Sequence, residues 1–174
     1  ITASAFNKIC NDPYQLFASN LIGPPSVVLF RKNIQELYDT NLKWLVDLEG
    51  YVRMIKKYKA AYIPLPVVNM SYNETQVTND CFRNPDVEIK EALIYYQKHG
   101  DAVYRSWISY DGWWRLLRNL SIRSLADLQL YAGELEIPAF LQSMLKFQQR
   151  IPLSLLKIGA LSKIAMTISF IFKD

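Results

Sequence analysis

Asp47 is the residue of this chain best placed for acid–base chemistry. Around it, apolar residues recur at steps of three, four and three: Leu45, Leu48, Val52 and Ile55. That spacing predicts a helix with one buried face and places Asp47 in its first turns. The dipole of a helix favours an ionised carboxylate near its N-terminus, which is the form that a general base needs. The alternative is an acid that only complements the dipole or caps the first turn.

Two charged residues close to Asp47 could bind a substrate. Glu49 could line the same site, but Arg53 follows it by four residues, so a surface ion pair between them is the favoured alternative. Arg31 directly follows an apolar run, where its guanidinium could face an acceptor or a phosphate with fork-like geometry. A position facing solvent at the end of a strand is equally compatible with its place in the sequence.

The tryptophans and the histidine of the second half are the remaining candidates. Aromatic residues at helical spacing are more typical of a core than of a sugar-stacking surface. We therefore expect Trp107 and Trp114 to be buried, and Trp113, between Gly112 and Arg115, to be exposed to a substrate. The single histidine, His99, ends a predicted helix, where a cation complements the dipole, and this capping role is favoured over a catalytic one.

The elements that must position Asp47 are predicted as an α/β arrangement. Gly23, Pro24 and Pro25 form a turn before the apolar run 26–30, which is typical of a buried inner strand. Residues 60–70 combine β-favouring side chains with two prolines, so we expect a strand at the rim of a sheet.

The second half is predicted to be helical. Start and stop signals predict helices from Asn84 to Gly100, from Asp101 onwards with an irregularity at Asp111-Gly112, from Ser124 to about Gly133, from Pro138 to about Arg150, and from Pro152. The last stretch, 151–172, is apolar but interrupted by Lys157 and Lys163, so it is marginal as a membrane span. An amphipathic helix on a membrane or against a partner domain fits better, and docking onto another part of the protein is the alternative.

Composition sets only broad limits on function. The 174 residues carry a net charge of +4, which suits anionic partners such as nucleotide diphosphates, lipid phosphates or a membrane surface, and no nucleic-acid partner is expected. The two cysteines are too few and too far apart to indicate a disulfide framework or a metal site.

Several of these features together resemble the acceptor-side half of family 2 glycosyltransferases. They are the small-residue turn, the apolar run that ends in Phe30-Arg31, and Val46-Asp47-Leu48-Glu49 followed by Arg53. Residues 16–23 before them and residues 62–68 and 74–78 after them fit the same pattern. The resemblance covers roughly residues 14–80 and excludes the helical second half.

The resemblance implies a partial GT-A-like mixed sheet in residues 1–80, followed by a helical extension at 81–174. It implies an inverting glycosyltransferase that moves a sugar from a nucleotide-sugar donor to a polysaccharide or glycolipid acceptor, with Asp47 as the general base. Arg31, Glu49 and Trp113 would then contact the substrate. Gln76 and Thr78 would be the nearest donor-binding groups.

The resemblance also implies a divalent metal, Mg or Mn, whose main ligands we expect outside this chain. No Asp-x-Asp occurs in the sequence, and Ser71 and Asn73 stand where many members of the family carry Arg-x-His. We therefore expect a fragment of a longer cytoplasmic enzyme, with contact at the inner face of the membrane as an option, and little activity from this part alone. The rival hypothesis is a non-catalytic helical interaction module that lacks a donor site.

Overall fold

The computed structural model describes residues 1–34, 38–66, 68–69 and 80–173, and every regular element in these ranges is helical. The longer helices are α1 (Ala3–Asn11), α2 (Val46–Lys57), α4 (Pro85–His99), α6 (Trp107–Asn119), α7 (Leu125–Ala132), α8 (Ala139–Gln149) and α10 (Gly159–Ile171). Shorter turns are η1 (Pro13–Phe17), η2 (Pro25–Val27), α5 (Ala102–Arg105) and α9 (Leu153–Leu156).

The predicted α/β fold with a GT-A-like sheet is wrong, because no strand occurs among the described residues. The run 26–30, expected as a buried inner strand, instead begins in η2, and its side chains are largely open to solvent, with Leu29 87% and Phe30 42% exposed. An apolar run forms a strand only if another strand pairs with it and a layer covers it, and the described chain supplies neither.

The predicted rim strand at 60–70 is also absent from the part of this stretch that the structure describes. Ile63 and Leu65 are 58% and 65% exposed. Tyr62 joins this segment to the N-terminal part of the chain. Its hydroxyl donates to the carbonyl of Ile1 at 2.7 Å, and its ring packs against Phe6 of α1. α1 itself was not predicted; the side chain of Thr2 caps it by accepting a hydrogen bond from the N–H of Ala5.

The helix predicted around Asp47 is confirmed as α2, with Leu48 and Val52 buried. Leu45, the residue just before α2, makes no side-chain hydrogen bond that would cap the first turn. The turn that leads into α2 is capped from α4: the buried carboxylate of Glu91 accepts from the N–H groups of Lys43, Trp44 and the N-cap residue Leu45 at 2.7–3.1 Å. Both oxygens of Glu91 accept these hydrogen bonds, which hold the start of α2 against the side of α4.

The predicted boundaries in the second half are mostly confirmed. The side chains of Asn84 and Ser124 cap α4 and α7, and Gly100 and Gly133 end these helices with positive φ, as glycine permits. The expected irregularity at Asp111-Gly112 is wrong, because α6 runs through it and the break lies earlier, at Ser106. Gly112 instead provides close contact between α6 and η1.

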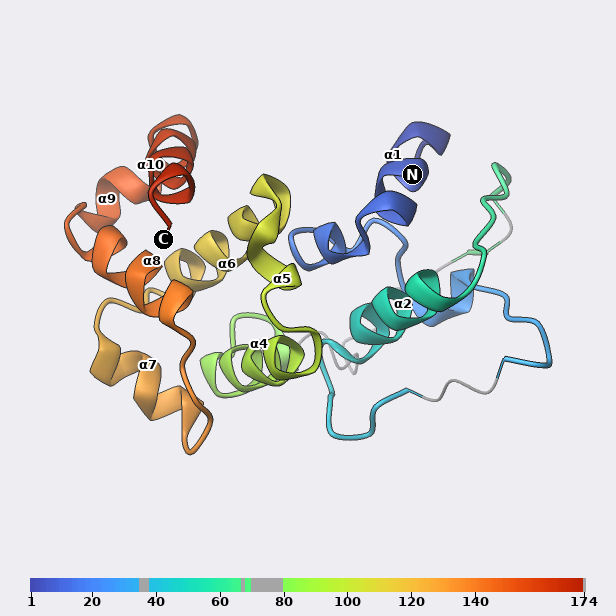
Figure 1. Cartoon of the computed structure of the whole chain (residues 1–174), viewed down its shortest axis with the longest axis horizontal. Helices are drawn as coiled ribbons and strands as arrows, with labels where there is room; N and C mark the ends of the chain where they lie inside the picture. The colour runs from blue at the N-terminus through green and yellow to red at the C-terminus, as the bar shows by residue number, and fades with distance from the viewer. Residues whose placement is uncertain (35–37, 67, 70–79, 174) are drawn as a thin grey trace.

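One hydrophobic core joins the two halves of the chain. It includes Leu16 of η1, Val52 of α2, Leu93 of α4, Trp113 of α6 and Met144 of α8. Phe17 stacks against both Tyr95 and Trp113, with centroids 5.3 and 4.5 Å apart. In Figure 1, α1 and α2 lie at one end of the molecule, α7 to α10 at the other, and α4 to α6 between them.

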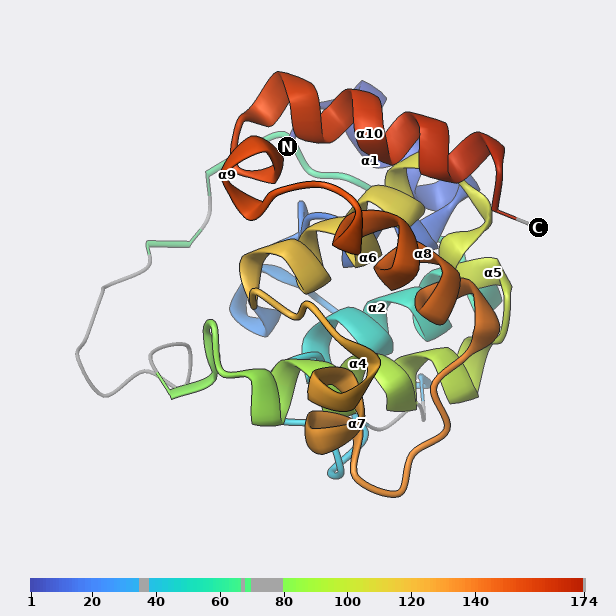
Figure 2. The ribbon, with the colours of Figure 1, turned by 90° about the vertical axis from the view of Figure 1, so that its left-hand side faces the viewer.

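The C-terminal segment is divided between α9 and α10, and α10 lies across α6 (Figure 2). It is anchored by Trp114, whose indole N–H donates to the hydroxyl of Ser162 at 3.0 Å, and by Tyr110, which shares a 2.7 Å hydrogen bond with Ser169. In the described ranges, no helix combines the length and apolar character that crossing a membrane would require.

Candidate functional site

Asp47 lies in the first turn of α2 and is half-buried. Its charge acts on two nearby tyrosines, Tyr38 and Tyr51. Tyr51 follows one turn later on the same face of the helix, and its hydroxyl donates to the carbonyl of Gly23 at 3.1 Å. This bond holds the turn of small residues against α2. The turn at Gly23 and the helix that carries Asp47, which are well separated along the chain, therefore lie in contact.

Tyr38 connects Phe30, a third part of the family-like pattern, to α2. A Cβ at Gly50 would lie 2.7 Å from Cε1 of Tyr38, so the tyrosine ring packs directly on the backbone of α2. Phe30 meets the Tyr38 ring edge-on at 6.5 Å. The Tyr38 hydroxyl is buried and has no hydrogen-bond partner among the described residues. It is therefore a polar group beside Asp47 that a ligand could satisfy.

The ionisation of Asp47 differs from the expectation. Burial raises the pKa of Asp47, whereas its place in the first turn of a helix predicted a carboxylate favoured in the ionised form. Desolvation outweighs the dipole here. Burial, and to a smaller extent the negative charge of Asp47, raises the pKa of both Tyr38 and Tyr51, so both phenols stay protonated at neutral pH.

Glu49 does pair with Arg53 as predicted, but Glu49 itself is buried and not on the surface. Glu49 is 1% exposed, and it accepts from Nε and Nη2 of Arg53 at 3.1 Å each. Lys98 of α4 lies 3.2 Å from the same carboxylate. Although burial alone would raise the pKa of Glu49, the hydrogen bonds from Arg53 and Lys98 lower it on balance. Because Glu49 is two residues from Asp47, the two carboxylates lie on different faces of α2.

The two other predicted site residues that the structure describes, Arg31 and Trp113, are not placed as expected. Arg31 is exposed and follows no strand. The expected exposure of Trp113 is wrong: it is 0% exposed and its N–H donates to the carbonyl of Val103 at 3.0 Å, whereas Trp107, expected in the core, is 38% exposed. Trp114 is buried as predicted. Gln76 and Thr78, like Ser71 and Asn73, lie outside the described residues.

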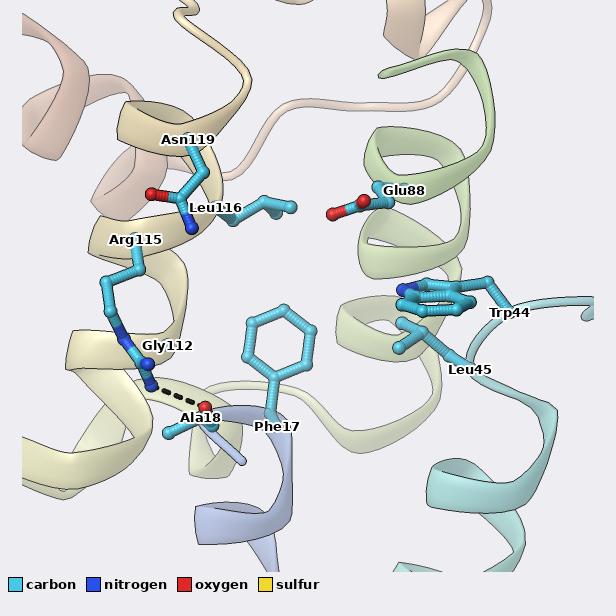
Figure 3. Close-up of a pocket in the computed structure, with 9 residues that line it drawn as sticks. All are labelled: Phe17, Ala18, Trp44, Leu45, Glu88, Gly112, Arg115, Leu116 and Asn119. Carbon is cyan, nitrogen blue, oxygen red and sulfur yellow. Dashed lines mark hydrogen bonds between the residues drawn. The ribbon is translucent and has the colours of Figure 1, made fainter. Parts of the chain in front are cut away.

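A small pocket of about 150 Å³ lies where η1, the approach to α2, α4 and α6 meet (Figure 3). Phe17, Trp44 and Leu116 line it with apolar surface, and Glu88, whose pKa is raised by burial, faces it from α4. Arg115 lies along α6 at one edge of the pocket and donates to the carbonyl of Ala18. Its volume is below that of an ordinary ligand site, and we interpret it as a packing crevice.

The described residues do not fit a divalent metal. No three His, Cys, Asp or Glu side chains within them come together as a ligand set. The carboxylates of Glu49 and Glu91 are engaged by cationic side chains and backbone N–H groups respectively.

Sequence reasoning missed two features. One is the capping role of Glu91, which joins residues 46 positions apart and leaves no local signal. The other is a basic pocket between the C-terminal end of α4 and the face of α2 that runs from Glu49 to Lys57. Its lysines could be recognised in the sequence only as basic residues near the ends of two helices. Only the tertiary structure brings the end of α4 to this face of α2, where Lys98 reaches Glu49.

Comparison with known proteins adds no relative: no family model, no curated protein and no solved structure matches the chain.

Proposed function

We propose that this chain carries the acceptor-side part of an inverting glycosyltransferase, in which Asp47 is the general base. One observation carries the proposal: Gly23, Phe30 and Tyr38, from the segment that carries the family-like residue pattern, converge on the face of α2 that bears Asp47 and Tyr51. The proposal depends on these residues and not on a GT-A-like sheet.

In this reaction the acceptor hydroxyl attacks the anomeric carbon of the donor sugar. A new carbon–oxygen bond forms while the bond from that carbon to the phosphate oxygen breaks, and the nucleotide diphosphate leaves with the electron pair. Asp47 takes the acceptor proton. The protonated phenol of Tyr38, which lacks a partner within the described chain, is available to hold an acceptor hydroxyl beside Asp47.

The raised pKa of Asp47 suits this role. A general base works best when its pKa approaches the pH at which it operates, and burial moves the pKa of Asp47 in that direction. The resemblance implies a divalent metal that would offset charge on the leaving group. The described residues do not fit that ion, so we assign no step of this chain to it.

The test compares two aspartates that occupy the same helical position. Asp47 and Asp86 are each the second residue of their helices, α2 and α4, but Asp86 is exposed. In the full-length protein, release of nucleoside diphosphate from a panel of uridine and guanosine diphosphate sugars would be measured with saccharide and glycolipid acceptors. We expect Asp47→Asn to reduce turnover roughly 10²–10⁴-fold and Asp86→Asn to leave it near wild type.

Two results would contradict the proposal. If no donor in the panel is turned over by the wild-type protein, the assigned reaction is wrong. If Asp47→Asn keeps more than about a third of wild-type turnover, far short of the loss expected for a base, Asp47 is not the base. Melting midpoints measured on the same preparations separate loss of chemistry from loss of fold.

The second candidate function is a non-catalytic interaction module whose partner is an anionic membrane surface. It is favoured by the solvent face of α10, where apolar side chains recur at steps of three and four: Leu161, Ile164, Ile168 and Ile171 are 42–65% exposed. Lys157, two residues before α10, is also exposed. Such a helix would place the protein at the inner face of the membrane without spanning it.

Cosedimentation with anionic and neutral vesicles tests this second candidate. We expect binding to anionic vesicles at low salt that weakens in Lys157→Glu and in Ile164→Ser. Leu130→Ser is the control, because Leu130 is equally apolar and 74% exposed but lies on α7. Equal binding by Leu130→Ser and Ile164→Ser, or no binding at low salt, would reject the membrane as the partner.

A further inference from the structure

A basic pocket lies between the C-terminal end of α4 and the face of α2 that runs from Glu49 to Lys57, away from Asp47. It has a volume of about 510 Å³ and is lined by Glu49, Arg53, Lys56, Lys57, Lys98 and His99. Four of these six residues are cationic at neutral pH and one is anionic, so the lining carries a net charge of 4 − 1 = +3. Asp39, paired with Lys98 at the edge, lowers the total to +2.

The single carboxylate in the lining is already engaged. Both oxygens of Glu49 accept from Arg53, and Lys98 lies 3.2 Å from one of them. Lys56 has a neutral partner, because its ammonium donates to the hydroxyl of Tyr14 at 2.6 Å. The charge of Lys56 is therefore not cancelled by this contact, and the pocket keeps a positive potential.

His99 provides an independent indication of a ligand. Its side chain is only 8% exposed, it lines the pocket, and its Nε2 is buried without a hydrogen-bond partner among the described residues. The nearest carboxylate oxygen, on Glu49, is 3.8 Å away, beyond hydrogen-bond distance. Its ring is fixed edge-on against Tyr14 and Tyr95. A buried nitrogen held in place without a partner calls for an explanation, and a bound polar ligand supplies one.

The charges that face His99 make an anion the complementary ligand. Burial is the larger cause that lowers the pKa of His99 to about 4, and Lys56, Lys98 and Arg53 lower it further, while Glu49 opposes them. His99 is therefore neutral at pH 7. It therefore does not supply the cation expected at the end of α4. Lys98 is the cation of that last turn, and Gly100 ends the helix as predicted.

We propose that this pocket binds a phosphate-bearing anion, with Lys56 and Lys98 on its oxygens and Nε2 of His99 as a further hydrogen-bonding group. Flexible ammonium groups suit tetrahedral phosphate, and the volume accommodates more than a single phosphate group. The inference is independent of glycosyl transfer. Lys56 lies on a face of α2 away from Asp47, Lys98 and His99 lie on α4, and none of these three residues is assigned to that reaction.

The single histidine makes the test direct, because its imidazole gives one set of NMR signals. The full chain would be titrated with inorganic pyrophosphate at pH 7 and, in a second arm, with vesicles that contain phosphatidic acid. We expect a saturable shift of the His99 signals and a rise of its apparent pKa by at least one unit, because a bound anion stabilises the imidazolium. A response to pyrophosphate indicates a soluble ligand, and a response to vesicles alone indicates a lipid headgroup.

Lys56→Gln is the decisive variant, since its only described hydrogen bond is to Tyr14 and its loss leaves the Glu49 pairs intact. We expect it to weaken binding about tenfold or more, as loss of a contact to a charged group does. Lys146→Gln, at an exposed lysine of α8, is the matched control. Absence of a saturable His99 shift in both arms, or equal affinity of the two variants, would overturn the proposal.

Discussion

The carboxylate of Glu91 in the middle of α4 caps the turn that leads into α2. Oε2 of Glu91 lies 2.7 Å from the backbone nitrogen of Leu45, the residue just before α2 begins. Local N-caps come from a serine, threonine, aspartate or asparagine at the start of the helix itself. Here the cap comes from a distant helix, so the first turn that carries Asp47 depends on the packing of α4.

Glu91→Gln should therefore destabilise the fold. The amide keeps the size of the side chain but loses the charge and replaces one acceptor oxygen with a donor that faces N–H groups. We expect the free energy of unfolding to fall by about 2 kcal/mol, as for loss of hydrogen bonds to a charged group. Glu134→Gln, at an exposed position, should change it by less than about 0.5 kcal/mol. Urea unfolding of both variants would decide, and equal stability would mean that the cap contributes little.

Gly112→Ala should also destabilise the protein. A Cβ at this position would lie 3.0 Å from both the nitrogen and Cα of Ala18 and 2.9 Å from the Phe17 ring. The backbone of η1 would have to move, at a cost of about 1–3 kcal/mol. The control is Gly159→Ala at the start of α10, where a Cβ meets nothing within 4 Å. There the better helix former should be neutral or slightly stabilising, and thermal melting compares the two.

Ser162→Ala should loosen the contact between α10 and α6. The Ser162 hydroxyl accepts from the indole of Trp114 and from Nη1 of Arg118, both at 3.0 Å. Without it the buried indole N–H has no partner, which costs roughly 1–3 kcal/mol. The specific effect would be a rise in the amide exchange rate that is larger in α10 than in α4. If exchange rises equally in both helices, the hydroxyl supports the whole fold and not this contact alone.

His99 should make the protein less stable as the pH falls. Its pKa is about 4 in the folded protein because of burial, against an ordinary value near 6.5. Between these values the unfolded chain binds a proton that the folded protein does not, so the free energy of unfolding decreases as pH falls from about 6.5 towards 4. The loss should be on the order of 2–3 kcal/mol.

The pH series should be measured in a buffer without phosphate and compared with His99→Gln, which cannot titrate. The raised pKa values of Asp47 and Glu88 act in the opposite direction, because the folded protein takes up those protons first. They are common to both proteins, so the difference between the two curves isolates His99. Parallel curves would show that His99 is protonated in the folded state as readily as in the unfolded chain.

The amino-acid sequence by itself determined the helices that carry their own signals. α2 has an apolar face at regular spacing, and α4 and α7 have capping side chains at one end and glycines with positive φ at the other. These signals act over a few residues, so they can be recognised without knowing the rest of the molecule. The ion pair of Glu49 with Arg53 is local in the same sense.

The tertiary structure decided whatever depends on a distant partner. The run 26–30 has the composition of a strand, but a strand needs a neighbour to hydrogen-bond its backbone, and the described chain offers none. Trp107 and Trp113 share one helix, and only the packing of η1 and α10 determines which of them is buried.

The candidate sites follow the same division. That Asp47 lies in a first helical turn was predictable, but its raised pKa results from burial, which segments elsewhere in the chain produce. The basic pocket needs residues from α2 and α4, which are 42 positions apart between Lys56 and Lys98. Local chemistry thus specified which groups are present, and packing specified their solvation and their neighbours, because burial and charge depend on atoms that the sequence does not place.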